Sequence, residues 1–317
     1  MHYIPKCKKK EQKKLSSTGH IRLNHPLQLI NFAAEEATMG GGTTGSQAMA
    51  GIFNPAMLDK RAWDGRLVHE HITAAGLDPA KITDAKRPRG SLAAFVELHI
   101  EQSDRLIQAE KQIAIVDGFV GIRRYTVTFH GKANHAGTTP MHGRQDALLM
   151  AAPLISFVNN LAIELDIVGT IGDFNVYPGA PNVIPERVDL IIEIRGLHTD
   201  VLDQAKSILA TEVGKMGGTF STVVEKPPVT ADTIVKEALT TACAKLNLST
   251  LSMPSGAGHD AMVISHLCPQ GIFFVPSQNG ISHSKDEFTT AEDCLNGAKL
   301  YLETIIELDQ TLTKNNE

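Results

Sequence analysis

The chain has 317 residues, of which 42% are hydrophobic and 21% are charged, and its formal net charge is -5. This length predicts about two domains, and the composition is that of a soluble globular protein with a sizeable buried core. The negative balance gives no general reason to expect nucleic acid or an acidic membrane as a partner, so small molecules are the favoured ligands.

The cysteines and the first residues bear on where the protein works. The four cysteines lie far apart and form no CxxC pair, which indicates neither a zinc knuckle nor a disulfide framework: Cys7, Cys243, Cys268 and Cys294. We therefore expect a reduced, cytoplasmic protein. Residues 1–24 are rich in lysine, without an apolar run of signal-peptide length, and we expect a solvated, disordered start. No stretch elsewhere is expected to span a bilayer.

Two predicted strands in the first part of the chain end at polar residues. Residues 27–32 have the pattern of a short buried strand, which runs into the adjacent carboxylates Glu35 and Glu36. Residues 94–99 form the next predicted strand, and it ends at His99. In an α/β sheet, ligands gather at the carboxyl ends of strands, which is where these three side chains would lie.

The segment between those two strands is predicted to hold a loop, a helix and a connection. A glycine-rich loop occupies residues 40–45. Asn54 followed by Pro55 is typical of a helix N-cap with proline at the first helical position, and it predicts a helix to about Ala75. The polar residues 78–90 are then expected to form a surface connection.

From residue 122 the pattern becomes that of a sheet with one wet face. Tyr125, Val127 and Phe129 alternate with polar side chains. The next elements are predicted as helices and strands in turn: helix 145–161, strand 167–177, strand 187–195, helix 200–216 and strand 219–224. The resulting order, β-α-β-β-α-β, is that of the split βαβ sandwich, which we expect as a compact inserted domain over residues 118–225.

Past residue 226 the chain is predicted to return to the first domain, so that residues 25–117 and 226–317 form one unit. A helix over 231–246 is followed by a glycine-containing loop and a short helix, and then by a buried strand over 271–276. Thr290 with Asp293 three residues later resembles a capping arrangement for a final helix to about Leu312.

Some polar residues in these segments suit metal chemistry. Glu36, His99 and His283 each follow an apolar run, and imidazole with carboxylate is the ligand set that suits zinc, manganese and related divalent ions. If Glu36 binds a metal, its neighbour Glu35 stays available to take a proton from water. Taken alone, each of these residues fits an ordinary structural or solvated role better than the role of a ligand.

Other candidates also have two interpretations. His135, in a turn-rich loop at 134–141, fits a turn histidine that bonds its own loop. Asn182 fits a turn residue, Arg195 a surface charge at a strand end, and His259 with Asp260 a helix cap.

With these segments in view, the chain resembles the hydantoinase/carbamoylase family of zinc-peptidase-like dinuclear amidohydrolases, over residues 25–308. That family includes N-carbamoyl-L-amino-acid hydrolases and allantoate amidohydrolases. The resemblance implies an α/β/α catalytic domain with an inserted ferredoxin-like βαββαβ lid and dimerisation domain. The segments that carry it are 35–36, 45–51, 99–102, 121–124, 134–141, 181–185, 256–261, 274–277 and 280–283.

The resemblance also implies roles for single residues. Glu35 would be the general base, Glu36 and His283 would bind one metal ion, and His99 would bind the other, with zinc or manganese as the metal. His135 would act from the lid, in the site of a partner subunit of a homodimer. Further residues would bind a small ureido substrate: Gln102, Asn182, Arg195 and His259. Nucleic acid and membranes are not expected partners.

One departure from the family pattern leads to alternatives. The family places a His-x-Asp metal motif and a bridging aspartate upstream of the two glutamates, and residues 1–32 supply neither. His20 and His25 stand in no matching context. We therefore expect a truncated chain with an incomplete metal site. An inactive remnant that still dimerises, and an aminoacylase or dipeptidase of the same fold, remain open as alternatives.

Overall fold

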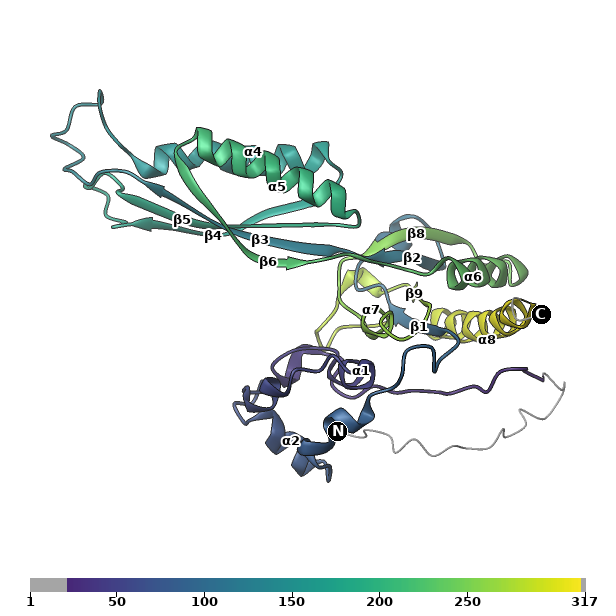
Figure 1. Cartoon of the computed structure of the whole chain (residues 1–317). Coiled ribbons are helices and arrows are strands. Elements are labelled where there is room, and N and C mark those ends of the chain that lie inside the picture. Colours follow the sequence, from purple (N-terminus) through teal and green to yellow (C-terminus); the bar gives the residue numbers. More distant parts are fainter. Residues whose placement is uncertain (1–21, 315–317) are drawn as a thin grey trace. The chain divides into compact units, whose positions relative to one another are not determined.

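The computed structural model describes residues 22–314, so that most of the lysine-rich start lies outside the described residues. The chain divides into two compact units (Figure 1). Unit 1 contains residues Met1–Phe119 and Thr230–Glu317, and unit 2 contains Val120–Val229. Both units are mixed α/β, as the sequence predicts.

Unit 1 is built on a sheet of five strands. Their order is β1-β9-β2-β7, with β8 also paired to β2. Strands β1 and β9 are parallel, as are β2 and β8, whereas β2 and β9 are antiparallel. The strand bounds are β1 Phe95–Ile100, β2 Ile113–Phe119, β7 Val229–Thr230, β8 Thr250–Ser255 and β9 Gln270–Val275.

Helices pack on both faces of this sheet. The α-helices of unit 1 are α1 Thr44–Ala50, α2 Val68–Ala74, α3 Arg105–Gln108, α6 Thr233–Lys245, α7 Asp260–Ile264 and α8 Ala291–Lys314. Short 3₁₀ helices add η1 Ala37–Met39, η2 Pro55–Asp59, η3 Pro79–Ala85 and η4 Gln278–Gly280. Apolar side chains of α6 and α8 share one core with Val96 and Phe273, while α1 and α7 form a separate core with Phe95.

The two cores determine which side chains of β1 lie on each face of the sheet. Successive side chains of a strand alternate between the two faces of a sheet. Val96 therefore faces α6 and α8, together with Leu98 and Ile100, which pack in the same core. Glu97 and His99 consequently project from the opposite face of β1, where α7 lies.

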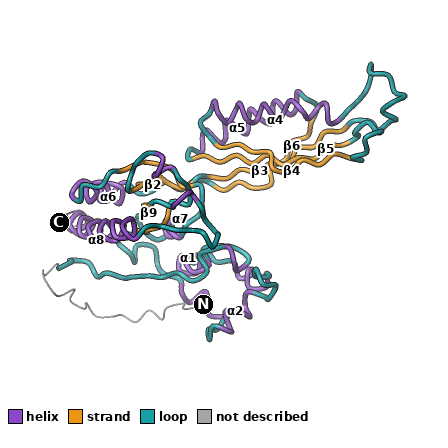
Figure 2. Tube along the Cα trace, turned by 180° about the vertical axis from the view of Figure 1, so that it is seen from behind, coloured by secondary structure: helices purple, strands orange, loops and turns teal. Residues whose placement is uncertain are grey.

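Unit 2 has the order β-α-β-β-α-β, as the sequence predicts (Figure 2). Its antiparallel sheet has the strand order β4-β5-β3-β6. Its elements are β3 Gly121–His130, α4 Ala147–Glu164, β4 Val168–Tyr177, β5 Arg187–Gly196, α5 Thr199–Lys215 and β6 Gly218–Lys226. The apolar residues predicted to share one face, among them Tyr125, Val127 and Phe129, are buried under α4 and α5.

Two predicted elements of unit 1 are wrong. Residues 27–32 belong to no sheet; they are extended backbone from which Phe32 packs against Phe95, with 6.2 Å between the ring centroids. The helix expected from Asn54 to Ala75 is broken. Asn54 does cap η2, because its side chain accepts a hydrogen bond from the backbone of Ala56 at 3.0 Å. A turn with Gly65 at a left-handed φ of 85° then separates η2 from α2.

Helix α4 also departs from expectation, because among the described residues it alone is long and apolar enough to cross a membrane. The match rests on length and composition only. One side of α4 packs in the core of unit 2, where Ala151, Leu154 and Val158 are buried. The core helix of a soluble protein can have the same length and composition.

A polar contact joins three elements of unit 1 and makes its stability depend on pH. Lys236 of α6 lies 2.5 Å from one carboxylate oxygen of Asp117 in β2, and the hydroxyl of Ser252 in β8 donates to the other at 2.7 Å. Burial alone would raise the pKa of Asp117, but these two hydrogen bonds and the lysine charge outweigh it and lower the pKa.

Replacing Asp117 by asparagine should therefore destabilise the protein by about 1 kcal/mol near neutral pH. The pKa of Asp117 is lower in the folded protein than in the unfolded chain, where it is about 3.9. The ionised carboxylate therefore stabilises the fold above about pH 3.9, and this stabilisation is lost as the pH falls through the pKa of the folded state. Thermal unfolding of wild type and Asp117→Asn should thus differ at pH 7 and converge below about pH 4. A difference that grows on acidification would contradict this assignment.

Candidate active site

The carboxyl end of β1 is where unit 1 gathers its polar residues. β1 and β9 are parallel, and His99 stands opposite Phe274 in the register. Both strands therefore end at the same edge of the sheet. The loop that follows β9 carries His283, and the short segment that follows β1 carries Gln102.

Glu35 reaches this edge from a tight loop. The backbone N–H of Thr43 donates to the carbonyl of Glu35 at 2.7 Å, which returns the chain into α1. The side chain of Glu35 is half-buried. Burial, and then the neighbouring carboxylate of Glu36, raise its pKa, whereas His283 acts in the opposite direction.

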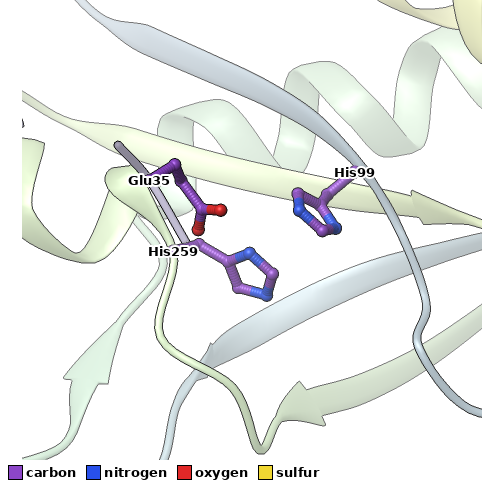
Figure 3. Close-up of side chains that lie close together, drawn as sticks. All are labelled: Glu35, His99 and His259. Carbon is purple, nitrogen blue, oxygen red and sulfur yellow. The ribbon is translucent and has the colours of Figure 1, made fainter. Parts of the chain in front are cut away.

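Glu35, His99 and His259 come together at one point (Figure 3). One ligand atom from each lies within 4.8 Å of the other two. The rings of His99 and His259 meet edge to face, with 4.5 Å between their centroids. His259 is only 2% exposed, and burial followed by the nearby His99 lowers its pKa to about 3, so the ring is neutral at physiological pH.

Glu36 and His283 form a second contact close by. Nε2 of His283 lies 3.0 Å from a carboxylate oxygen of Glu36. Gln102 joins them, because its amide donates to the hydroxyl of Ser282 at 3.0 Å and lies 3.5 Å from the ring of His283. The structure thus brings together all six site residues that the sequence analysis assigned to unit 1.

Unusual backbone conformations mark the same residues. Ala34, Gln102 and His283 all have left-handed φ values, between 54° and 59°, although none is glycine. Gly280 has a φ of 65°, and a side chain there would meet the backbone of Asp104 at 3.0 Å. Such conformations persist where the surrounding structure imposes them, and they are frequent at functional sites.

Two acids beside the site, the buried Asp260 and the half-buried Glu97, were not assigned to the site from the sequence. Glu97 accepts a hydrogen bond from the backbone of Ala261 at 2.7 Å, and burial raises its pKa to about 8 despite that bond. Asp260 accepts one from the hydroxyl of Ser46 at 2.5 Å, and burial raises its pKa to about 6. Glu97 stands two positions before His99 on the same face of β1, a spacing that could have identified it.

Two of the expected lid residues lie together in unit 2. Nδ1 of His135 accepts hydrogen bonds from the backbones of Gly137 at 3.1 Å and Thr138 at 3.2 Å. His135 is therefore a residue that bonds its own loop, and in the neutral ring the proton is on Nε2. The carbonyl of Asn182 accepts from Ala136 at 2.9 Å, so Asn182 lies beside this loop.

Arg195, the third expected lid residue, is held by a carboxylate. Its Nε donates to Glu193 at 2.8 Å, and Arg124 of β3 contacts the other oxygen of the same carboxylate. Burial would raise the pKa of Glu193, but the two guanidinium groups outweigh burial and lower it. Glu193 therefore fixes the orientation of Arg195.

Arg195 and His135 belong to opposite ends of the unit 2 sheet. Arg195 pairs with Ile122 at the start of β3, whereas Arg187 pairs with His130 at its end, just before the loop of His135. Arg187 and Arg195 are eight positions apart in β5, or about 27 Å at about 3.4 Å per residue. A small ligand cannot touch Arg195 and His135 of the same chain.

The residues of unit 1 suit a divalent metal. Two imidazoles and a carboxylate form a donor set that zinc takes in hydrolases. Nδ1 of His259 is buried and has no hydrogen-bond partner among the described residues, a costly state that a bound cation would relieve. Glu36 and His283 offer two further donors next to this group.

Comparisons with known proteins show the family of this chain. The model of peptidase family M20/M25/M40 matches residues 15–307. An N-carbamoyl-L-amino acid amidohydrolase of Geobacillus stearothermophilus is 39% identical over 295 residues, which cover 90% of this chain and 72% of the relative. An allantoate amidohydrolase of Bacillus subtilis is 31% identical over 294 residues, covering 89% and 70%.

A solved structure gives the same result. A crystal structure of an amidase of the hydantoinase/carbamoylase family from Burkholderia multivorans matches with a TM-score of 0.79 and 30% identity, covering 91% of this chain and 72% of that one. The chain therefore belongs to peptidase family M20/M25/M40, among its hydantoinase/carbamoylase-type members.

Proposed function

We propose that this protein is a metal-dependent amidohydrolase of ureido compounds, with N-carbamoyl-L-amino acids or allantoate as substrates. The observation that carries the proposal is the convergence of Glu35, His99 and His259 within 4.8 Å, beside the contact between Glu36 and His283. The names of the relatives support the substrate class, since they include N-carbamoyl-L-amino acid and allantoate amidohydrolases.

The residues of unit 1 would hold the metal and move the proton. Glu36 with His283, and His99 in the neighbouring group, are the proposed ligands of two ions, either zinc or manganese. A divalent ion supplies Lewis acidity and makes water more acidic when bound. Glu35 then accepts the proton of the attacking water, for which its raised pKa makes it a better base than an exposed glutamate. Gln102 is proposed to contact the substrate.

The reaction is hydrolysis of the carbamoyl group. Water attacks the carbamoyl carbon, the C–N bonds of the ureido group break, and the amine, ammonia and carbon dioxide are released. The proton that Glu35 accepts passes to a leaving nitrogen. One ureido group and one water thus account for all three products.

The residues of unit 2 would bind the substrate. Arg195 suits a carboxylate, because its planar guanidinium can bind two oxygens at once, and Glu193 holds it in place at 2.8 Å. His135 offers its Nε2–H as a donor, and Asn182 beside it offers an amide. In one chain Arg195 and His135 belong to opposite ends of the sheet, with about 27 Å of β5 between Arg187 and Arg195. A complete site would therefore take Arg195 and His135 from different chains.

We therefore propose that the protein works as a homodimer formed through unit 2. Strand β4 is an edge strand of the sheet, and an edge presents unpaired backbone groups to a partner. Its Val168 is 62% exposed, and the outer side of α4 exposes Leu149 by 70% and Ile163 by 73%. An exposed apolar patch of this kind is typical of a subunit interface.

The proposed location is the cytoplasm. The described cysteines, Cys243, Cys268 and Cys294, are all free thiols. Burial raises the pKa of both Cys243 and Cys268 to about 11, which keeps them protonated and unreactive. Free thiols in a protein of this size are typical of a reducing compartment.

Ammonia release from a panel of substrates tests the function. The chain should release ammonia from N-carbamoyl-L-amino acids or allantoate when zinc or manganese is supplied, lose this activity on chelation, and regain it when the metal is returned. N-acetyl amino acids and dipeptides serve as comparison substrates. Turnover of only those compounds would assign the chain to the aminoacylases or dipeptidases instead, and no turnover of any substrate would refute the proposal.

A further inference from the structure

We propose that His259 is a metal ligand that binds through Nδ1, and that Ser255 is the positioning residue that prepares it. This inference deepens the proposed function, on which it rests, by naming ligands of its metal. It replaces the substrate-binding role that resemblance gives to His259. The site is that of Glu35, His99 and His259, and its ligand class is a divalent cation that accepts nitrogen and oxygen donors.

The hydrogen bonds of Ser255 determine which nitrogen of His259 carries the proton. The hydroxyl of Ser255 donates to the carbonyl of Ala257 at 3.0 Å. Having used its proton there, the hydroxyl oxygen can only accept from Nε2 of His259, which lies 3.1 Å away. Nε2 of the neutral ring is therefore protonated, and Nδ1 keeps its lone pair. That lone pair is buried and without a partner among the described residues.

A hydrogen bond also fixes which nitrogen of His99 carries the proton. Its Nδ1 lies 2.9 Å from the carbonyl of Ile100. A carbonyl can only accept, so in the neutral ring Nδ1 carries the proton and Nε2 keeps its lone pair. Metal-binding histidines generally donate their second nitrogen to a carbonyl or carboxylate in this manner, which orients the ring.

The result is a group of acceptors with no donor between them. One ring nitrogen of each histidine and a carboxylate oxygen of Glu35 lie within 4.8 Å of one another (Figure 3). Buried acceptors that lack donors are costly. A protonated Glu35 could donate a hydrogen bond to only one of the two nitrogens, whereas a divalent cation can bind both nitrogens and the carboxylate.

This donor set matches that of zinc hydrolases. Two histidines and one glutamate are the protein ligands of several catalytic zinc sites, with a further position left for water or substrate. A carboxylate that binds a cation through one oxygen keeps lone pairs on the other. Glu35 can therefore contribute to this site and still accept a proton, as the proposed function requires.

Cobalt binding to the chelator-treated chain of 317 residues tests the inference without any need for turnover. Co²⁺ is titrated into wild type and three variants, and its visible absorption is followed. His259→Phe removes the nitrogen but keeps the ring shape, and should weaken binding about 100-fold or more. Ser255→Ala should weaken it about 10-fold, because it removes only the partner that fixes the ring. His266→Asn changes an exposed histidine and should bind like wild type.

Nitrogen NMR of the histidine rings adds a test that does not depend on the variants folding. In the metal-free wild type, His259 should carry its proton on Nε2, and addition of Zn²⁺ should shift the Nδ1 resonance. A proton on Nδ1, an unshifted Nδ1 resonance, or wild-type cobalt affinity in folded His259→Phe would overturn the inference. Failure of wild type to bind cobalt would do the same.

The test of His259 as a ligand can fail or succeed independently of the test of the proposed activity. Cobalt binding that depends on His259, without ammonia release, would support the ligand assignment and refute the activity. Ammonia release with metal binding that is indifferent to His259 would support the activity and refute the assignment.

Discussion

Replacing Glu35 by glutamine is expected to lower kcat for ammonia release by about 10²–10⁴-fold, the usual contribution of a positioned general base. Glutamine has the same shape but cannot accept a proton. The position of Glu35 explains the size of the effect: its carboxylate is half-buried beside Glu36 and lies within 4.8 Å of the proposed ligands His99 and His259. Water cannot replace a base that is held at this place.

The assay needs saturating metal, because the substitution also weakens the proposed metal site. Glu237→Gln is a matched control, since it makes the same chemical change on an exposed residue of α6 in the same unit. The control should retain wild-type turnover. If Glu35→Gln kept more than about a tenth of the wild-type kcat at saturating metal, another group would have to be the base.

Two inactive variants are expected to restore activity when they are combined. Arg195→Ala and His135→Ala should each lose most turnover, because each lacks a proposed substrate contact. Within one chain these residues lie at opposite ends of the unit 2 sheet, so the proposed site takes them from two chains. In a mixed dimer, one of the two sites regains both residues, and the other lacks both.

Statistical mixing of equal amounts makes half of the dimers mixed, so about a quarter of the wild-type activity should return. The mixture is prepared by co-expression, and ammonia release is measured after purification of both chains together. A mixture of Arg195→Ala with Arg195→Lys is a suitable control, because neither chain of that pair can supply the missing arginine. No recovery in the first mixture would contradict a site that is shared between two chains.

The strands and helices of unit 2 could be predicted from the periodicity of its apolar residues. Its strands alternate apolar and polar residues, as in Tyr125, Val127 and Phe129, because one face of the sheet is covered by helices and the other is not. In helices α4 and α5, apolar residues recur at helical spacing, which gives each helix one apolar side that packs on the sheet. Irregularities interrupt the register of β4 and β6 only locally. The order β-α-β-β-α-β could therefore be predicted from the sequence.

Unit 1 was harder to predict because its elements depend on distant partners. Strand β2 is buried on both faces and has a continuous apolar run without a period, and neither it nor β8 was predicted. Residues 27–32 have the apolar content of a strand but pack through side chains such as Phe32, without joining a sheet. Composition alone cannot distinguish these two cases.

The site was also only partly predictable. His99 and His283 could be selected because each lies at or after the end of a strand, and imidazole suits metal chemistry. Glu35 and Glu36 were selected for their residue type alone, since the strand predicted before them is extended backbone outside any sheet. The acids Glu97 and Asp260 were missed, since the surroundings that raise their pKa values are created by tertiary packing. The lone pair of His259 could not be foreseen either, because it depends on a hydroxyl whose orientation only the folded loop sets.

The central claim, a divalent metal held at the carboxyl end of β1, is tested most directly by anomalous scattering. Crystals of the zinc-loaded chain would be measured on both sides of the zinc absorption edge, and a difference map computed. We expect a peak enclosed by Nε2 of His99, Nδ1 of His259 and the carboxylate of Glu35. A map without a peak in unit 1, or with zinc bound only to residues elsewhere, would contradict it.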